Sequence, residues 1–336
     1  MHASSIPDIA VVGAGPCGIG VGIAAREAGL GCTLFDKGVV AASLGNYPVF
    51  MTFFSTAERL EIGGVPFTIA GDKPIRREAI RYYQRLADHF HLDVRQYHTV
   101  TAIAKHDDHF RLATRSTSGD TVHHARNVVI ATGYFDHPNT LDVPGQHLGK
   151  LAYGYREGHP FFRQNVLIVG GGNSAVDAAL ELFRWKAAVT IVHFAEGLDA
   201  GVKPWVLPDI TGRIRAGEIT ARFRTRIAEI RPASVLLRNE DSGHLDEVPN
   251  DWVLAMTGFT PDPALLRELG VHIHPVSGIP HHDPQTMRTN VDGVFIAGVL
   301  AAGFDANKVF IENGRDHGRS IVSAIGALSD GGGRAR

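Results

Sequence analysis

Two glycine-rich segments have the residue types and spacing that bind the phosphates of a dinucleotide. The first is Gly13-Ala14-Gly15-Pro16-Cys17-Gly18, and the second is Gly170-Gly171-Gly172-Asn173-Ser174-Ala175. Each follows a short apolar run and opens a predicted helix, so that backbone N–H groups and the positive end of the helix dipole face the phosphates. Two such loops predict two dinucleotides bound at once, and the natural pair is a flavin and a nicotinamide cofactor.

The first loop lies in a complete βαβ pattern. The strand predicted at 9–12 precedes it, the helix predicted from Pro16 to about Ala28 follows, and the strand predicted at 32–35 ends in Asp36. An acid at this place accepts hydrogen bonds from the ribose hydroxyls of an adenosine. Within the loop, the three glycines are expected to make the turn, admit the pyrophosphate and pack the helix on the strand, in the order Gly13, Gly15, Gly18.

The second loop lacks the corresponding acid. Asp36 follows Gly13 by 23 residues, and the same spacing from Gly170 reaches His193. No carboxylate stands there to bind a 2′-hydroxyl or to repel a 2′-phosphate, which favours NADPH in the second site and FAD in the first. His193 and Lys203 are the predicted partners of the 2′-phosphate, and the alternative for His193 is a plain strand-end residue.

The elements around the two loops occur in the same order twice. Each loop is followed by a helix and a strand, then by a hairpin pattern, and then by a strand that ends in Thr-Gly; these later parts lie at 118–120 with 128–133 and at 239–243 with 252–258. A last strand at 293–298 has no glycine loop after it and is expected to rejoin the first domain.

The pattern predicts an α/β fold with two Rossmann-like, three-layer ββα domains, the second inserted into the first. Residues 1–138 and 262–336 form the predicted FAD-binding domain, and residues 139–261 the NADPH-binding domain. A final helix from about Asn307 to Ile325 is expected to point its N-terminus at the flavin, where Lys308 would stabilise negative charge on the reduced ring. The alternative for Lys308 is a solvated surface lysine.

Composition excludes several classes of partner. The chain of 336 residues has 33 Lys plus Arg and 35 Asp plus Glu, so no basic field attracts nucleic acid or an anionic membrane. No apolar stretch reaches the roughly 20 residues of a membrane span, and the start lacks the features of a signal peptide. The pairs His123-His124 and His281-His282 lack the four-ligand arrangement of a structural zinc site, so no metal is predicted. A cytoplasmic protein is expected.

Several longer segments resemble the bacillithiol disulfide reductase family within the thioredoxin-reductase class of flavoproteins. The most specific are TFFSTAERLEIGGVPF at 52–67, KPWVLP at 203–208 and FIENGR at 310–315, beside ATGYFDHP at 131–138, GGGNSAVDAALEL at 170–182 and AMTGFTPD at 255–262. The resemblance implies an NADPH- and FAD-dependent reductase of a low-molecular-weight thiol disulfide that serves thiol redox homeostasis. It also implies a homo-oligomer, with a bacilliredoxin-like protein as a further candidate partner.

Two departures from the wider class stand out. Its thioredoxin reductases carry a Cys-x-x-Cys pair that this chain lacks, and Val299 stands where an aspartate usually holds the flavin ribitol. The predicted FAD-binding residues are Gly13, Gly15, Pro16, Cys17, Gly18, Asp36, Lys37, Thr132, Gly133, Gly298, Lys308 and Val309. The predicted NADPH-binding residues are Gly170, Gly172, Asn173, Ser174, Ala175, His193, Lys203 and Gly258.

Cys17 is the candidate catalytic residue. Cys17 and Cys32 flank the first predicted helix, which spans about 18 Å, whereas disulfide partners need Cα atoms within about 7 Å. A cysteine would therefore act alone, through a mixed disulfide with the small thiol. A helix N-terminus lowers the pKa of a thiol, and a neighbouring pyrophosphate opposes that effect. Direct attack by reduced flavin, a separate partner protein and a packing role for Cys17 remain alternatives.

Three other functions fit the two glycine loops. A ferredoxin–NADP reductase on the same fold also lacks the cysteine pair, a flavin monooxygenase also has two loops, and a flavin-bearing redox sensor would turn over NADPH very slowly. The Tyr153-Gly154…His159 segment matches the monooxygenase fingerprint poorly. Fold alone does not separate these functions, because one scaffold serves several chemistries.

Overall fold

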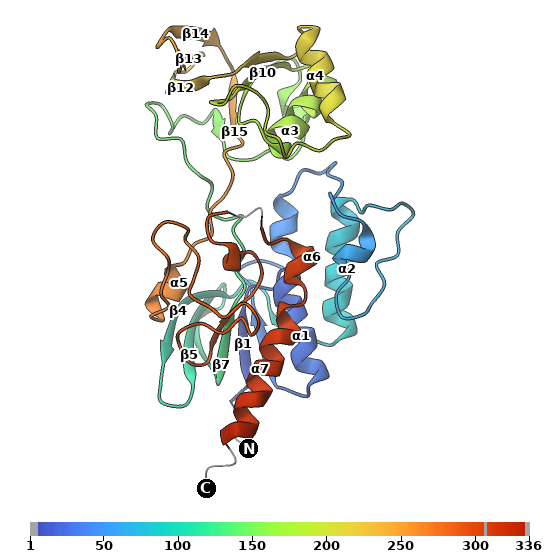
Figure 1. Ribbon diagram of the computed structural model, residues 1–336, viewed down its shortest axis with the longest axis vertical. Helices are drawn as coiled ribbons and strands as arrows, with labels where there is room; N and C mark the ends of the chain where they lie inside the picture. Colours follow the sequence, from blue (N-terminus) through green and yellow to red (C-terminus); the bar gives the residue numbers. More distant parts are fainter. Residues whose placement is uncertain (1–5, 306–307, 333–336) are drawn as a thin grey trace. The chain divides into compact units, whose positions relative to one another are not determined.

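The computed structural model describes residues 6–305 and 308–332 and divides into two compact units. The first unit comprises residues 6–46, Met51–His137 and the chain from Phe259 onward, and the second comprises Pro138–Gly258. The second unit is thus an insertion, so that the blue and the red parts of the ribbon in Figure 1 share one unit. Tyr47–Phe50 also belongs to the second unit, where the N–H of Val49 donates to the carbonyl of Arg156.

A parallel sheet of five strands forms the centre of the first unit. Its order is β16-β7-β1-β2-β3. The sequences IAVV, NVVI and VFI of three neighbouring strands are buried almost throughout, as expected for a parallel sheet covered on both faces. The strands are β1 (Ile9–Val12), β2 (Cys32–Phe35), β3 (Asp93–Arg95), β7 (Asn127–Ile130) and β16 (Val294–Ile296). The last predicted strand therefore does rejoin the first sheet.

Helices and a second, antiparallel sheet pack with this parallel sheet. Side chains of α1 and α7, of the parallel strands and of β5 share one hydrophobic core, and α1 and α7 lie side by side (Figure 1). The helices are α1 (Pro16–Glu27), α2 (Arg76–His89), α5 (Ala264–Glu268), α6 (Ile311–Gly314) and α7 (His317–Gly332), with 3-10 helices η1 (Ala42–Asn46), η2 (Ala57–Leu60) and η4 (Gly298–Ala302). The antiparallel strands are β4 (Thr99–Lys105), β5 (Phe110–Ser116) and β6 (Gly119–Ala125).

The second unit repeats this plan. Its parallel sheet has the order β11-β10-β9-β15-β8, and a three-stranded antiparallel sheet has the order β12-β13-β14. The strands are β8 (Leu151–Ala152), β9 (Asn165–Val169), β10 (Ala188–Val192), β11 (Thr220–Arg222), β12 (Thr225–Ile230), β13 (Ser234–Asn239), β14 (Leu245–Pro249) and β15 (Trp252–Ala255). The helices are η3 (His159–Phe161), α3 (Asn173–Arg184) and α4 (Leu207–Arg215). The predicted α/β fold class and both predicted hairpins are confirmed.

The C-terminal helical segment differs from its prediction. A single helix from Asn307 was expected; Asn307 lies outside the described residues, and the segment that follows forms two helices, α6 and α7, with Arg315 and Asp316 between them. The restart at His317 places Gly318 against α1, where a Cβ on Gly318 would overlap the carbonyl oxygen of Gly20. Nη1 of Arg315 donates to the carbonyls of Glu58 and Glu61, both at 2.9 Å, which fixes the junction.

No helix among residues 6–305 and 308–332 is both long and apolar enough to cross a membrane.

Candidate functional site

The first glycine loop has one open position between two crowded ones. Gly13 adopts φ +110°, and a Cβ there would overlap the carbonyl oxygen of Ala131, while a Cβ on Gly18 would overlap that of Gly13. A Cβ on Gly15 would meet nothing within 4 Å. Gly15 is also the N-cap of α1, and no side chain caps that end of the helix. The loop therefore offers an open cradle of N–H groups that fits a pyrophosphate.

Asp36 lies at this loop. Its Oδ2 accepts a hydrogen bond from the N–H of Ala14 at 2.7 Å, and its Oδ1 accepts one from the N–H of Gly38 at 2.8 Å. Burial raises the pKa of Asp36, and the two N–H donors partly oppose that shift. Each carboxylate oxygen keeps one lone pair, so the side chain can still accept from ribose hydroxyls. The neighbouring Lys37 pairs instead with Asp136, at 2.8 Å.

Cys17 is half-buried and packs against the core of the first unit. A Cβ built on Gly298 or on Gly314 would lie 3.0 Å or 2.8 Å from its Sγ, so both glycines are in contact with the thiol. Burial raises the pKa of Cys17 to about 12. The expected lowering by the helix N-terminus is therefore wrong, because the loss of hydration at this partly buried position outweighs the helix dipole. The two cysteines are both free thiols.

The sequence analysis did not identify His317. This histidine contacts Gly298, the glycine that packs against the thiol of Cys17. The N–H of Gly298 donates to Nδ1 of His317 at 3.1 Å, which requires an unprotonated Nδ1. Burial, followed by the nearby His282, lowers the pKa of His317. No sequence signal links two residues that are 19 positions apart and belong to η4 and α7.

The remaining residues predicted for FAD follow the ends of β7 and β16. Gly133, after Thr132, adopts φ +72°, and Gly298 adopts φ +74°. Lys308 lies before α6 rather than in a helix, and its Nζ is 3.2 Å from Oδ2 of Asp305. Lys308 thus lies two residues before the N-cap of α6, Phe310, and its role toward the flavin stays a prediction. Val309 precedes the same helix, and its side chain approaches Gly314.

The second glycine loop matches the first in its turn. Gly170 adopts φ +134°, and a Cβ there would lie 2.7 Å from the carbonyl oxygen of Met256, as Gly13 does with Ala131. Gly172 is the N-cap of α3, and no side chain caps this end either. The carboxylate of Asp199 approaches it, since a Cβ on Gly172 would lie 3.0 Å from Oδ2. The loop fits a second pyrophosphate, with Asp199 at its margin.

The residues after Gly172 shape the margin of this loop. Asn173 binds the segment that carries Asp199: its Nδ2 donates to the carbonyl of Gly201 at 2.9 Å, and its Oδ1 accepts from the N–H of Lys203 at 2.8 Å. Ser174 and the buried Ala175 lie in the first turn of α3. Gly258, after β15, adopts φ +82°.

The two predicted partners of the 2′-phosphate do not face the surface. His193 is only 4% exposed, and its ring packs against Gly171. Neither ring nitrogen has a hydrogen-bond partner; Oδ1 of Asp199 is 3.2 Å from Nε2, but the orientation does not make a hydrogen bond. Nζ of Lys203 lies 2.6 Å from Oδ2 of Asp177, and both side chains are largely buried. The prediction that His193 and Lys203 bind the 2′-phosphate is therefore wrong, because one ring is buried and the other side chain pairs with Asp177.

Comparison with known proteins gives matches to flavoprotein and disulfide reductase sequences over most of the chain. The sequence profile described as "Pyridine nucleotide-disulphide oxidoreductase" matches residues 10–298. Bacilliredoxin reductase Bdr of Bacillus subtilis is 40% identical over 315 residues, which are 94% of this chain and 96% of the relative.

Two solved structures have the same fold over nearly the whole chain. The bacillithiol disulfide reductase Bdr (YpdA) from Bacillus cereus superposes with a TM-score of 0.93 at 37% identity, covering 96% of this chain and 100% of the other. The enzyme of that name from Staphylococcus aureus has a TM-score of 0.91 at 36% identity, covering 96% and 98%.

Proposed function

This chain belongs to the pyridine nucleotide-disulphide oxidoreductase family, and we propose that it reduces the disulfide of bacillithiol with electrons from NADPH. It is a flavin-dependent disulfide reductase whose cofactors are FAD and NADPH. The proposed substrate rests on the relatives whose names state bacillithiol disulfide or bacilliredoxin and which match this chain from end to end. None of these relatives favours a ferredoxin reductase, a monooxygenase or a redox sensor.

The observation that carries the proposal is the pair of glycine loops, one in each unit, of which only the first has an acid, Asp36, directly after the second strand of its βαβ unit. Asp36 supports assignment of FAD to the first unit, residues 1–138 and 262–336, because its carboxylate can accept from ribose hydroxyls. NADPH is then assigned to the second unit, residues 139–261, where His193 takes the corresponding position. With FAD at the first loop and NADPH at the second, the flavin would supply the two-electron transfer from the nicotinamide to the disulfide.

Without a separate partner protein, the route from flavin to a bound disulfide has two candidates. The chain has only two cysteines and no Cys-x-x-Cys pair, so no internal dithiol relays electrons. If Cys17 forms a mixed disulfide, its thiol must first lose a proton that burial holds firmly. The direct route needs no protein thiol. Both routes oxidise one NADPH, consume one proton and release two small thiols.

The proposal also covers the location, the assembly and a protein partner of the enzyme. We place the enzyme in the cytoplasm as a homo-oligomer, with a bacilliredoxin-like protein as a second electron acceptor. The resemblance to bacillithiol disulfide reductases supports these assignments, as does the balanced charge of the chain.

The test is NADPH oxidation by the FAD-loaded enzyme with bacillithiol disulfide, glutathione disulfide and coenzyme A disulfide. Bacillithiol disulfide is expected to be turned over fastest. Equal rates with all three, or activity only with a redox protein such as thioredoxin or ferredoxin, would contradict the proposal. Repeating the assay with Cys17→Ala separates the routes, because only the mixed-disulfide route loses turnover.

A further inference from the structure

Three arginines lie in β11, in β12 and in the turn between them, in the unit proposed to bind NADPH. Arg222 ends β11, Arg224 occupies the turn into β12, and Arg226 lies in β12. They neighbour the segment after β10, because the N–H of His193 donates to the carbonyl of Arg222 and the N–H of Arg224 donates to that of Ala195. In a βαβ nucleotide-binding unit the adenosine ribose lies at the end of the second strand, which here is β10.

Phe194 marks that place on the surface. It follows the buried His193, and its side chain is 55% exposed. The guanidinium of Arg226 lies 4.7 Å from the centre of its ring. An exposed aromatic ring with a cation on its face is a platform suited to an adenosine that bears an extra phosphate.

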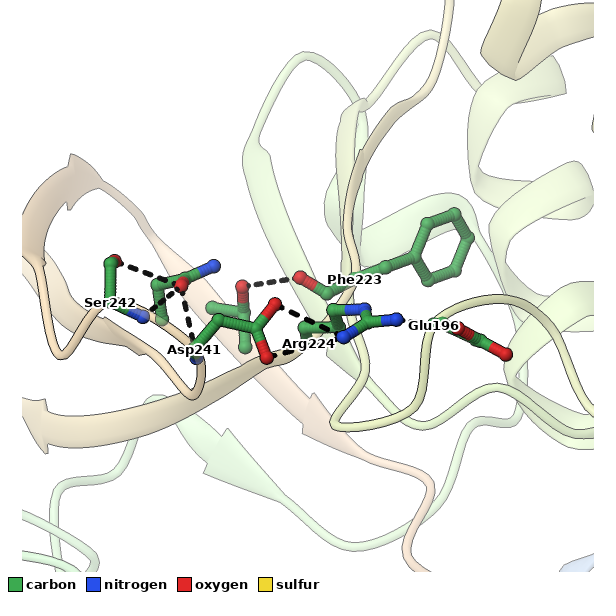
Figure 2. A network of polar contacts seen from close by, with 7 residues as sticks. Glu196, Phe223, Arg224, Asp241 and Ser242 are labelled. Carbon is green, nitrogen blue, oxygen red and sulfur yellow. Dashed lines mark hydrogen bonds and ion pairs between the residues drawn. The ribbon is translucent and has the colours of Figure 1, made fainter.

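Arg224 has the most constrained position of the three. Its backbone adopts φ +49°, a left-handed conformation that is strained for a residue other than glycine. Its Nη2 donates to Oε2 of Glu196 at 2.5 Å, and its Nη1 is 3.2 Å from both carboxylate oxygens of Asp241 (Figure 2). Asp241 is itself held in the turn after β13, where its N–H donates to Oδ1 of Asn239. The guanidinium is therefore held by two acids: Asp241, which is fixed by its hydrogen bond to Asn239, and Glu196, in the loop after β10.

We propose that Arg224, supported by Arg226 and Phe194, binds the 2′-phosphate of NADPH and makes the enzyme select NADPH over NADH. Glu196 is the group that the phosphate replaces, because its side chain is 79% exposed and an exposed ion pair contributes little stability. A phosphate dianion forms stronger, bidentate hydrogen bonds to a guanidinium than this carboxylate does. Asp241 keeps the guanidinium oriented. This inference rests on the proposed function only through its use of NADPH.

The test measures the affinity of the FAD-loaded protein for NADP⁺ and for NAD⁺ by isothermal titration calorimetry. Arg224→Gln is expected to weaken NADP⁺ binding by about 10- to 100-fold and to change NAD⁺ binding by less than about twofold, because only NADP⁺ has the extra phosphate. Glu196→Gln removes the competing carboxylate and is expected to tighten NADP⁺ binding several-fold, an effect that a merely structural role would not produce.

Arg231→Gln is the matched control. Arg231 also bridges two acids, Glu229 and Glu247, but lies at the other end of β12. It is expected to leave both affinities unchanged. Equal loss of NADP⁺ and NAD⁺ binding in Arg224→Gln, or no loss of either, would overturn the inference while the proposed reaction stands. Loss of NADP⁺ selectivity in Arg224→Gln, in an enzyme that does not reduce bacillithiol disulfide, would support the inference and overturn the proposed substrate.

Discussion

The chemistry of single residues in this protein depends on what covers them. Cys17 lies in the first turn of α1, which favours a thiolate, yet its thiol packs against Gly298 and Gly314 and its pKa rises to about 12. Asp36 likewise keeps two backbone N–H donors, and burial still raises its pKa. In both cases the loss of hydration raises the pKa by more than the neighbouring N–H dipoles lower it.

The raised pKa of the Cys17 thiol predicts a loss of folding stability at alkaline pH. An unfolded cysteine releases its proton near pH 9 and the folded one near pH 12, so the folded state binds more protons between these values. Its contribution to stability is present below pH 9 and is lost as the pH rises, by about 1.4 kcal/mol for each pH unit above 9. Urea unfolding of the FAD-loaded enzyme at pH 8 to 10.5 is expected to show a shallower decline in Cys17→Ala than in the wild type.

The control for this experiment is Ser323→Ala, on the exposed face of α7. It should follow the wild-type decline. Identical slopes for Cys17→Ala and the wild type would mean that the thiol titrates alike in the folded and unfolded chain.

At the scale of elements, the junction between α6 and α7 organises the first unit. Arg315 connects the junction to the segment around η2 through two carbonyls, and Gly318 lets α7 approach α1 closely. The same two helices place Gly314 and His317 beside Cys17 and Gly298. The break between the helices thus positions residues around the first nucleotide loop.

Arg315→Ala is expected to destabilise the protein by about 2 kcal/mol, because two carbonyls of the η2 segment lose a charged donor. Chemical denaturation of the FAD-loaded protein measures the change. Arg319→Ala, an exposed arginine one turn later, is the matched control and should change stability by less than about 0.5 kcal/mol. Similar losses in the two variants would show that the contacts of Arg315 contribute no more than general surface charge.

At the scale of the whole molecule, one architecture is used twice, and each copy is proposed to hold one cofactor. Gly13 and Gly170 are equivalent positions: each has a positive φ, and a Cβ on either would clash with a carbonyl at the end of a neighbouring strand. The same substitution at the two sites therefore tests which unit holds which cofactor.

Gly13→Ala is expected to lose FAD on purification, seen as loss of flavin absorbance, because the clash displaces the first loop. Gly170→Ala is expected to retain FAD and to lose its reduction by NADPH, measured anaerobically as bleaching of the flavin. Each variant is the control for the other, and circular dichroism checks that both fold. Loss of FAD in Gly170→Ala with retention in Gly13→Ala would reverse the assignment.

Local patterns explain which predictions succeeded. The helix and strands around both loops, and the hairpins that follow them, depend on glycine, proline and apolar runs within about 30 residues, and all were predicted. The predicted roles of His193 and Lys203 depended instead on side-chain direction. His193 turns inward against Gly171 and Lys203 pairs with Asp177, which no spacing along the chain reveals.

By itself the sequence determined two dinucleotide-binding units, an acid 23 residues after the first glycine of only one loop, and the lack of an internal dithiol. These features depend on residue type and short-range spacing. Only the tertiary structure decided that Cys17 is a half-buried thiol of raised pKa and that Arg224 lies beside the end of β10. Hydration and charge act through space, and residues that are distant along the chain set both of them here.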